Sequence, residues 1–214
     1  MLKVYLLRHG LTDWNKLRRV QGSSDIPLNE EGRRVARLTA EGMRDMPIDL
    51  VYSSPLKRAR ETAEIICAGR DVPIVFDERI REIGFGEFEG VTWPEIYENE
   101  ECAGFRKFFF DPDNYVPERG AESIEKVIAR GKSFLEERIY PHEGEDLTIL
   151  VAAHGAMIRG LQAAGRGADK TNFWGGPWGG SGKPLKNCGA ALVTVENGMM
   201  KIVEPSLIFY SEET

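Results

Sequence analysis

The sequence predicts an α/β fold, a three-layer α/β/α sandwich around a mostly parallel sheet with one antiparallel edge strand. Strand-like and helix-like segments alternate along most of the 214 residues, an order typical of a parallel sheet with helices on both faces. Asn197-Gly198 joins apolar segments at 190–195 and 199–204, which indicates a hairpin and hence an antiparallel pair. No linker or repeat is visible, so we expect one domain over residues 1–214.

Each element follows from local patterning. Short apolar runs predict buried strands at residues 3–8, 48–53, 73–76 and 147–153. Helical spacing predicts helices at 29–44, from Ser54-Pro55 to about Cys67, at 123–139 and after His154. We expect Asn29 to be the N-cap of the first helix. We expect Ser54 to be the N-cap of the second, with Pro55 at its first helical position.

Two long stretches are expected to be irregular, and stretches of this kind are typically functional or disordered. Residues 92–120 are rich in aromatic side chains, and residues 165–189 are rich in glycine and tryptophan. The first is expected to be a lid-like insertion, which either acts in specificity or simply packs on the sheet as a small helical lid. In the second, Trp174 and Trp178 either cover an apolar substrate or lie in a solvent-exposed loop.

Charge and composition exclude several classes of function. The net charge of −6 argues against a broad surface for nucleic acids or anionic membranes, but not against a local basic pocket. No apolar run is long enough to cross a bilayer, and the apolar stretch after Lys3 breaks at Arg8, too early for a signal peptide. Three widely spaced cysteines without metal-ligand spacing indicate free thiols, so we expect a cytoplasmic protein. No pattern indicates an oligomeric state.

Two histidines follow strands in equivalent ways. His9 and Gly10 end the first predicted strand, and His154 and Gly155 end the strand at 147–153. Ligands bind at the carboxyl ends of parallel strands, so neighbouring strands would bring both rings into one crevice, with glycines that allow close approach. One such histidine is more often structural, but two in matching positions indicate a site. The third, His142, lies in a polar connection and is expected at the surface.

Basic and acidic candidates lie near the same strand ends. Arg8 adjoins His9, and Arg58 falls in the first turn of the helix after residues 48–53, where a helix N-terminus favours an anion. Guanidinium groups bind phosphate oxygens in pairs, although Arg58 alone would suit a solvated helix face. Glu82 follows the strand at 73–76 and is expected to reach the crevice, whereas Glu87 and Glu89 are expected to be surface acids.

Other catalytic motifs are incomplete. The stretch 179–183 resembles a nucleotide-binding P-loop, but Pro177 and Pro184 stand where that motif requires glycine and serine or threonine. Clustered metal ligands and the nucleophile elbow of serine hydrolases are not found in the sequence.

Taken together, the motifs resemble the histidine phosphatase superfamily, which includes the cofactor-dependent phosphoglycerate mutases. The similar blocks, in order, are Leu7-Arg8-His9-Gly10 with Thr12 and Asn15, Gln21-Gly22 with 25–28, 53–59 with Thr62-Ala63, Glu82 with Gly86 and Glu89-Gly90, 120–123, and Ala153-His154-Gly155.

The resemblance implies a metal-independent phosphoric monoester hydrolase of the histidine acid phosphatase type, without a cofactor, acting on a small phosphorylated molecule. It implies that His9 accepts the phosphoryl group and that Glu82 acts first as acid and then as base. It also implies that phosphoryl oxygens are held by Arg8, Arg58 and a protonated His154, and that the mouth of the site is lined by Asn15, Gln21, Gly22 and Gly155.

Two alternatives stay open. Mutases of this family carry Glu-Arg-His-Tyr-Gly after the acid, where this chain has residues 82–86 with the sequence Glu-Ile-Gly-Phe-Gly, a difference that favours a phosphatase. A non-catalytic phosphate-binding module would retain the same charged residues. The substrate also stays open, since sugar phosphates, phosphoglycerates, nucleotide-pathway intermediates and phosphoproteins all suit the core site.

Overall fold

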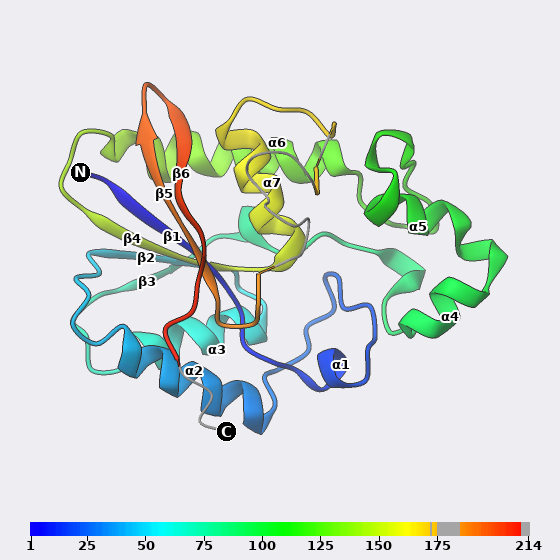
Figure 1. The fold of residues 1–214 in the computed structure, drawn as a ribbon, viewed down its shortest axis with the longest axis horizontal. Coiled ribbons are helices and arrows are strands. Elements are labelled where there is room, and N and C mark those ends of the chain that lie inside the picture. Colours follow the sequence, from blue (N-terminus) through cyan, green and yellow to red (C-terminus); the bar gives the residue numbers. More distant parts are fainter. Residues whose placement is uncertain (172, 175–184, 211–214) are drawn as a thin grey trace.

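The computed structural model describes residues 1–171, 173–174 and 185–210. Its strands are β1 (Lys3–Arg8), β2 (Leu50–Ser53), β3 (Ile74–Phe76), β4 (Thr148–Ala153), β5 (Ala190–Glu196) and β6 (Met199–Leu207). They form one sheet in the order β3-β2-β4-β1-β5-β6 (Figure 1). The strands β3, β2, β4 and β1 pair in parallel with their neighbours. β5 then pairs antiparallel with β1, and β6 pairs antiparallel with β5. The mostly parallel sheet with an antiparallel edge is thereby confirmed.

Helices cover both faces of this sheet. The α-helices are, in chain order, α1 (Asp13–Lys16), α2 (Glu30–Gly42), α3 (Lys57–Ile66), α4 (Trp93–Glu98), α5 (Ala103–Phe110), α6 (Ile124–Phe134) and α7 (Gly155–Gly165). Figure 1 shows α2 and α3 on one face and α6 and α7 on the other, which gives the three predicted layers. A π-helical turn at Leu135–Ile139 extends α6. None of the helices in the described ranges is long and apolar enough to span a membrane.

Both faces of the central strands are buried. Leu6 and Val151 belong to the apolar cluster under α6 and α7, whereas Leu7 and Leu150 belong to the cluster under α2 and α3. Because side chains alternate across a strand, one continuous apolar run serves both clusters. Because β1 and β4 run parallel, the residues that follow them emerge at the same edge of the sheet.

The N-terminus of α3 differs from its prediction. Asn29 caps α2 as expected, accepting a hydrogen bond from the Gly32 N–H at 2.8 Å. The predicted cap at Ser54 is wrong, because α3 begins at Lys57 and its N-cap, Leu56, makes no side-chain cap. Ser54 instead continues the line of β2, with its backbone N–H bonded to Ala152 O at 2.9 Å. Its hydroxyl is therefore free to take another partner.

The irregular structure expected for residues 92–120 is wrong in part, because α4 and α5 form there. A capping box between Thr92 and Glu95, with proline in the first turn, starts α4. Phe105 and Phe108 of α5 are fully buried, and Phe105 stacks on Phe88 at 4.4 Å between ring centroids. The aromatic side chains of this stretch thus pack a small helical cap beside the carboxyl end of β1 (Figure 1).

Two glycines, Gly10 and Gly32, allow the turn after His9 to pack closely against α2. A Cβ atom on Gly32 would lie 2.1 Å from Leu11 O, and one on Gly10 would lie 3.0 Å from Gly32 O. Gly10 therefore serves backbone packing, and close approach of a ligand to it stays a prediction. This contact directs the chain as it leaves the site.

We expect Gly32→Ala to lower the free energy of unfolding by roughly 1–3 kcal/mol, the usual cost of overpacking, because the Leu11 backbone must move. Urea unfolding followed by circular dichroism measures the effect. Glu41→Ala, at an exposed position of the same helix, is the control. Equal stability of the two variants would contradict this account of the turn.

Candidate active site

The two strand-end histidines meet as predicted. Arg8 pairs with Ala153 in the parallel register of β1 and β4, so His9 and His154 follow at neighbouring positions. Their ring centroids are 5.2 Å apart, and both side chains are buried. His142 lies elsewhere, partly exposed and bonded to Glu145. The sheet therefore creates a pair of desolvated imidazoles at one edge.

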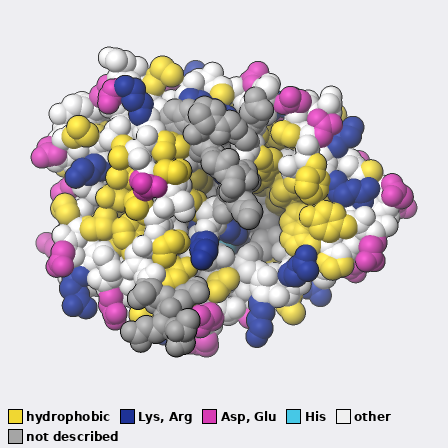
Figure 2. Space-filling model, viewed as in Figure 1, with side chains coloured by type: hydrophobic (Ala, Val, Ile, Leu, Met, Phe, Trp, Pro, Cys, Tyr) yellow, Lys and Arg dark blue, Asp and Glu magenta, His cyan; other side chains and the backbone are white. Residues whose placement is uncertain are grey.

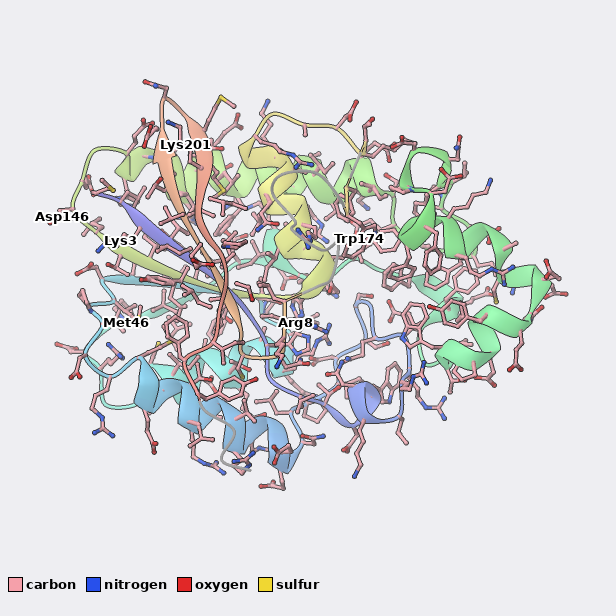
Figure 3. The ribbon with its side chains drawn as sticks, viewed as in Figure 1. Lys3, Arg8, Met46, Asp146, Trp174 and Lys201 are labelled. Carbon is pink, nitrogen blue, oxygen red and sulfur yellow. The ribbon has the colours of Figure 1, made fainter. Side chains whose placement is uncertain are left out.

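A pocket of about 240 Å³ opens beside this pair. Its lining includes eight of the nine predicted site residues, namely Arg8, His9, Asn15, Gln21, Gly22, Arg58, Glu82 and Gly155. The ninth, His154, lies beneath them and contacts His9. Figure 3 shows Arg8 at the end of β1 with Trp174 on the side toward α5. Figure 2 shows the hollow on this face, with hydrophobic side chains gathered over α4 and α5 beside it.

His9 is held as a neutral ring with one nitrogen available. Its Nδ1 lies 2.7 Å from Gly10 O, and a carbonyl oxygen can only accept, so Nδ1 carries the proton and Nε2 keeps its lone pair. Burial, followed by the charges of Arg58 and Arg8, holds the pKa of His9 well below its usual value. The ring is therefore a ready nucleophile at neutral pH.

Both arginines use their terminal nitrogens for backbone contacts. Arg8 Nη1 donates to Leu185 O at 2.6 Å, and Arg58 donates to Ser24 O and Gly22 O at 2.6 and 2.7 Å. Their Nε atoms are buried and have no partner among the described residues. Burial lowers the pKa of Arg58 to about 10, so its guanidinium is still charged at neutral pH. Each Nε–H is therefore a charged donor available to an anion.

Glu89 shapes the loop that receives Arg58. Its Oε1 accepts from Ser23 N–H at 2.8 Å and from Phe85 N–H at 2.9 Å, and its Oε2 accepts from the Ser24 hydroxyl. Gly22 has a φ of +53°, and a Cβ there would lie 2.2 Å from Glu89 Oε1. The prediction that Glu89 is a surface acid is wrong, because backbone donors from two loops converge on it.

His154 differs from the protonated state that the resemblance implies. Burial first, and then the charge of Arg58, hold its pKa well below the usual value. Its Nε2 lies 2.8 Å from Ser54 Oγ, which itself accepts the Leu56 N–H at 3.3 Å. With that lone pair occupied, the Ser54 hydroxyl can donate to Nε2 and leave the proton on Nδ1. This buried Nδ1 has no partner among the described residues.

Glu82 spans from its loop to the start of α7. Oε1 accepts from Ile83 N–H at 3.0 Å and Met157 N–H at 2.9 Å, whereas Oε2 accepts, among the described residues, only from Ala156 N–H at 3.2 Å. A Cβ on Gly155 would lie 3.9 Å from Oε2 and 3.8 Å from Arg8 Nε. Gly155 thus borders the space between acid and arginine, and Oε2 retains a lone pair for a proton.

Polar side chains on α1 and the next loop form the mouth. The Thr12 hydroxyl lies 3.2 Å from Asn15 Oδ1 and 2.9 Å from Gln21 Oε1. These contacts occupy the amide oxygens and make no use of the NH₂ groups. Asn15 and Gln21 can therefore offer donors to the pocket they line.

Three supporting residues escaped the sequence analysis. The Ser54 hydroxyl binds His154, Glu89 organises the arginine loop, and Asn187 Nδ2 donates to His9 O at 2.9 Å. The serine lies in the 53–59 block, which marks its neighbourhood as important. Asn187 follows a long glycine-rich stretch, and the sequence around it carries no comparable signal. Trp178 and the 179–183 stretch lie outside the described residues.

The site as a whole is a desolvated cationic pocket with one carboxylate. Among the residues that line the pocket, Glu82 is the one acid, and its charge partly offsets the charges of Arg8 and Arg58. Within the described ranges, no group of three histidine, cysteine, aspartate or glutamate side chains could hold a metal ion. Unpartnered N–H donors around a neutral imidazole suit an anion such as a phosphoryl group.

We expect the free energy of unfolding to fall as the pH drops below about 6.5, the ordinary pKa of histidine. In that range the histidines of the unfolded chain bind protons, whereas His9 and His154 of the folded chain stay neutral because their pKa values are lowered. The slope is at most about 1.4 kcal/mol per pH unit for each histidine. His154→Gln should reduce this slope in urea unfolding without phosphate or sulfate, and His142→Gln is the control. An unchanged slope in His154→Gln would contradict the burial of a neutral ring.

Known proteins resemble this chain over most of its length. The family profile of the histidine phosphatase superfamily (branch 1) matches residues 4–204. The chain is 34% identical over 174 residues to phosphoserine phosphatase 1 of Hydrogenobacter thermophilus, covering 81% of each chain. It is 37% identical over 171 residues to the uncharacterized phosphatase PhoE of Bacillus subtilis, covering 79% of this chain and 80% of that one.

A solved structure gives the same result for the fold. Bacillus stearothermophilus YhfR superimposes with a TM-score of 0.84 and 31% identity, over 98% of this chain and 99% of that chain. With the family profile and these relatives agreeing over most of its length, the chain belongs to the histidine phosphatase superfamily, branch 1.

Proposed function

We propose that this protein hydrolyses small-molecule phosphomonoesters through a phosphohistidine formed on His9. The observation that carries the proposal is the state of His9, a buried neutral ring whose Nδ1 is held by Gly10 O. Around it, Arg8 Nε, Arg58 Nε and His154 Nδ1 are buried nitrogens without partners in the described ranges. A nucleophile among unsatisfied donors is suited to attack on a bound phosphoryl group.

In the first step, His9 Nε2 attacks phosphorus, the N–P bond forms, and the bond from phosphorus to the ester oxygen breaks. The two arginines and His154 stabilise the charge on the three equatorial oxygens, which is most of what phosphoryl transfer requires. Glu82 gives the proton on Oε2 to the departing alcohol. This donation matters most for alcohols that leave poorly as anions.

In the second step, a water molecule attacks the phosphohistidine. Glu82, now a carboxylate, takes the proton from the water as its oxygen bonds to phosphorus, and the N–P bond breaks. Inorganic phosphate leaves, and His9 returns to the neutral ring. The charge that a metal ion supplies in other phosphoryl-transfer enzymes comes here from arginine, so we propose a metal-independent hydrolase of the histidine acid phosphatase type, named for its histidine acceptor.

Residues next to the acid favour hydrolysis over mutase activity. Ile83 and Phe85 are buried in the core, and both backbone polar groups of Gly84 bind Glu122. This stretch therefore offers no polar side chain that could hold a phosphorylated sugar acid while it reorients. The relatives described above are named phosphatases, and one of them is named for phosphoserine.

The cap supports a preference for esters with an apolar face. Beyond the phosphate end, the pocket is lined by Arg19 and by the aromatic side chains Phe85, Trp93, Phe108, Phe109 and Trp174. Phe109 and Trp174 stack at 5.8 Å, and Trp174 Nε1 is fixed to Phe108 O at 2.6 Å. We propose that residues 92–120 act as a cap in the single domain and set specificity.

The three cysteines are free and buried, which is compatible with the predicted cytoplasmic location.

Incubation with a radiolabelled phosphomonoester should label the protein with an acid-labile, alkali-stable phosphoryl group. His9→Ala should abolish labelling, because no other ring is placed to accept the phosphoryl group, and turnover should persist in EDTA. Labelling that survives in His9→Ala would refute the nucleophile. Passage of the label to 3-phosphoglycerate in place of water would indicate a mutase, and binding without any turnover would indicate a non-catalytic module.

We expect kcat/KM to be roughly tenfold higher for 2-phenylethyl phosphate than for ethyl phosphate, since burying an aromatic face is worth about 1–3 kcal/mol. The two alcohols leave with similar ease, so the ratio reports on the cap. Phe109→Leu should reduce the ratio several-fold. Its neighbour Phe110, which is 67% exposed and outside the pocket lining, gives the matched control Phe110→Leu. Equal ratios in both variants would contradict the proposed specificity.

A further inference from the structure

A largely buried ion pair contacts the loop that carries Glu82 and has no part in the proposed chemistry. Arg130 of α6 and Glu122, just before that helix, are 16% and 14% exposed, and neither lines the pocket. Glu82 itself lies on a loop between two short 3₁₀ turns, Glu78–Ile80 and Gly86–Phe88. Such a loop needs outside contacts to hold a carboxylate in one place.

Arg130 holds the backbone directly before Glu82. Its Nη1 donates to Arg79 O at 2.5 Å and to Arg81 O at 2.6 Å. Its Nε and Nη2 donate to the two carboxylate oxygens of Glu122 at 3.0 and 3.2 Å. The guanidinium therefore links α6 to the peptide bond that joins Arg81 to Glu82.

Glu122 holds the backbone just after Glu82. Its Oε2 accepts from Gly84 N–H at 3.2 Å, and its own N–H donates to Gly84 O at 2.7 Å. The loop is thus fastened on both sides of the acid by one ion pair. The Phe85–Ala121 bridge extends this junction toward the cap.

Arg130 also reaches the helix that receives the Glu82 carboxylate. Its Nη1 lies 2.7 Å from Met157 Sδ, and Met157 N–H binds Glu82 Oε1 at 2.9 Å. One side chain therefore contacts both segments that meet at the acid. An apolar pair of similar size would fill the same space but could not bind these carbonyl and amide groups.

We propose that Arg130 and Glu122 are positioning residues that set the place of Glu82 Oε2 beside the ester oxygen. The inference rests on the proposed function, since it assumes that Glu82 protonates the leaving group. Loosening the pair moves the acid and leaves His9, Arg8 and Arg58 in place. The defect should therefore depend on the leaving group, which a general loss of stability would not cause.

The kinetic test compares Arg130→Lys and Glu122→Gln with wild type on two esters, using kcat/KM because it reports the phosphorylation step. 4-Nitrophenol leaves without help from an acid, whereas 2-phenylethanol needs a proton. For 2-phenylethyl phosphate we expect kcat/KM to fall about 10- to 100-fold in Arg130→Lys, and less in Glu122→Gln, which keeps an acceptor for Gly84 N–H. For 4-nitrophenyl phosphate we expect a change of about twofold at most. Equal losses on both esters would overturn the proposal.

Two further variants calibrate this result. Glu82→Gln should show the same selectivity with a larger loss, on the order of 10²-fold or more for the alkyl ester. Lys132→Met changes an exposed cation of the same helix and should leave both esters unaffected. If wild type does not turn over 4-nitrophenyl phosphate, the proposed function is refuted. That outcome is distinct from equal losses in the variants, which overturn only the positioning role.

Amide hydrogen exchange tests the clamp without any catalysis. The N–H groups of Ala156 and Met157 bind the Glu82 carboxylate, so both should exchange faster in Arg130→Lys than in wild type. Protection in the middle of α6 should stay unchanged if the variant is folded. Unchanged exchange at Ala156 and Met157 in the folded variant would overturn the proposal, whatever the activity.

Discussion

Desolvation of positive charge at the carboxyl edge of the sheet governs the rest of this site. Arg8 and Arg58 lie beside two imidazoles, and burial is the first cause of the lowered pKa of each of these four groups. Arg58 keeps its charge at neutral pH because its pKa is lowered only to about 10, and arginine side chains in general stay protonated in proteins, whereas the pKa values of both histidines fall well below their usual value. A protein with a net charge of −6 thereby carries a local cationic pocket whose buried donors a phosphate dianion can satisfy.

The same constraint explains how the surrounding loops are built. Buried guanidinium groups need acceptors, and backbone carbonyls supply them. Leu185 O accepts from Nη1 of Arg8, and Ser24 O and Gly22 O accept from the two terminal nitrogens of Arg58, whereas neither Nε atom has a partner among the described residues. Those carbonyls must in turn be held, and Glu89 does so through the Ser23–Ser24 segment. A carboxylate that looks like a surface residue in the sequence is thus part of the arginine site.

The meeting of residues at neighbouring strand ends was predictable, whereas specific side-chain hydrogen bonds between distant segments were not. Apolar runs located β1 and β4, and the ends of parallel strands placed His9, His154 and their neighbours at one edge. The sequence does not show that Ser54 turns to His154 or that Arg130 reaches the Glu82 loop, because each partner is far away in the chain. A helical lid over residues 92–120 was only one of two alternatives, because dense aromatic residues obscure the helical period, and the Thr92–Glu95 capping box that starts α4 was not recognised.

The state of His154 shows how such a distant contact changes the chemistry. A protonated ring would place a third positive charge beside two arginines, and the structure disfavours it through burial and the charge of Arg58. The Ser54 hydroxyl makes that charge unnecessary, since donation to Nε2 leaves the proton on Nδ1, where a neutral ring can still bind a phosphoryl oxygen. In the role proposed for His154, a fixed dipole of this kind stabilises the transition state without proton uptake before each turnover.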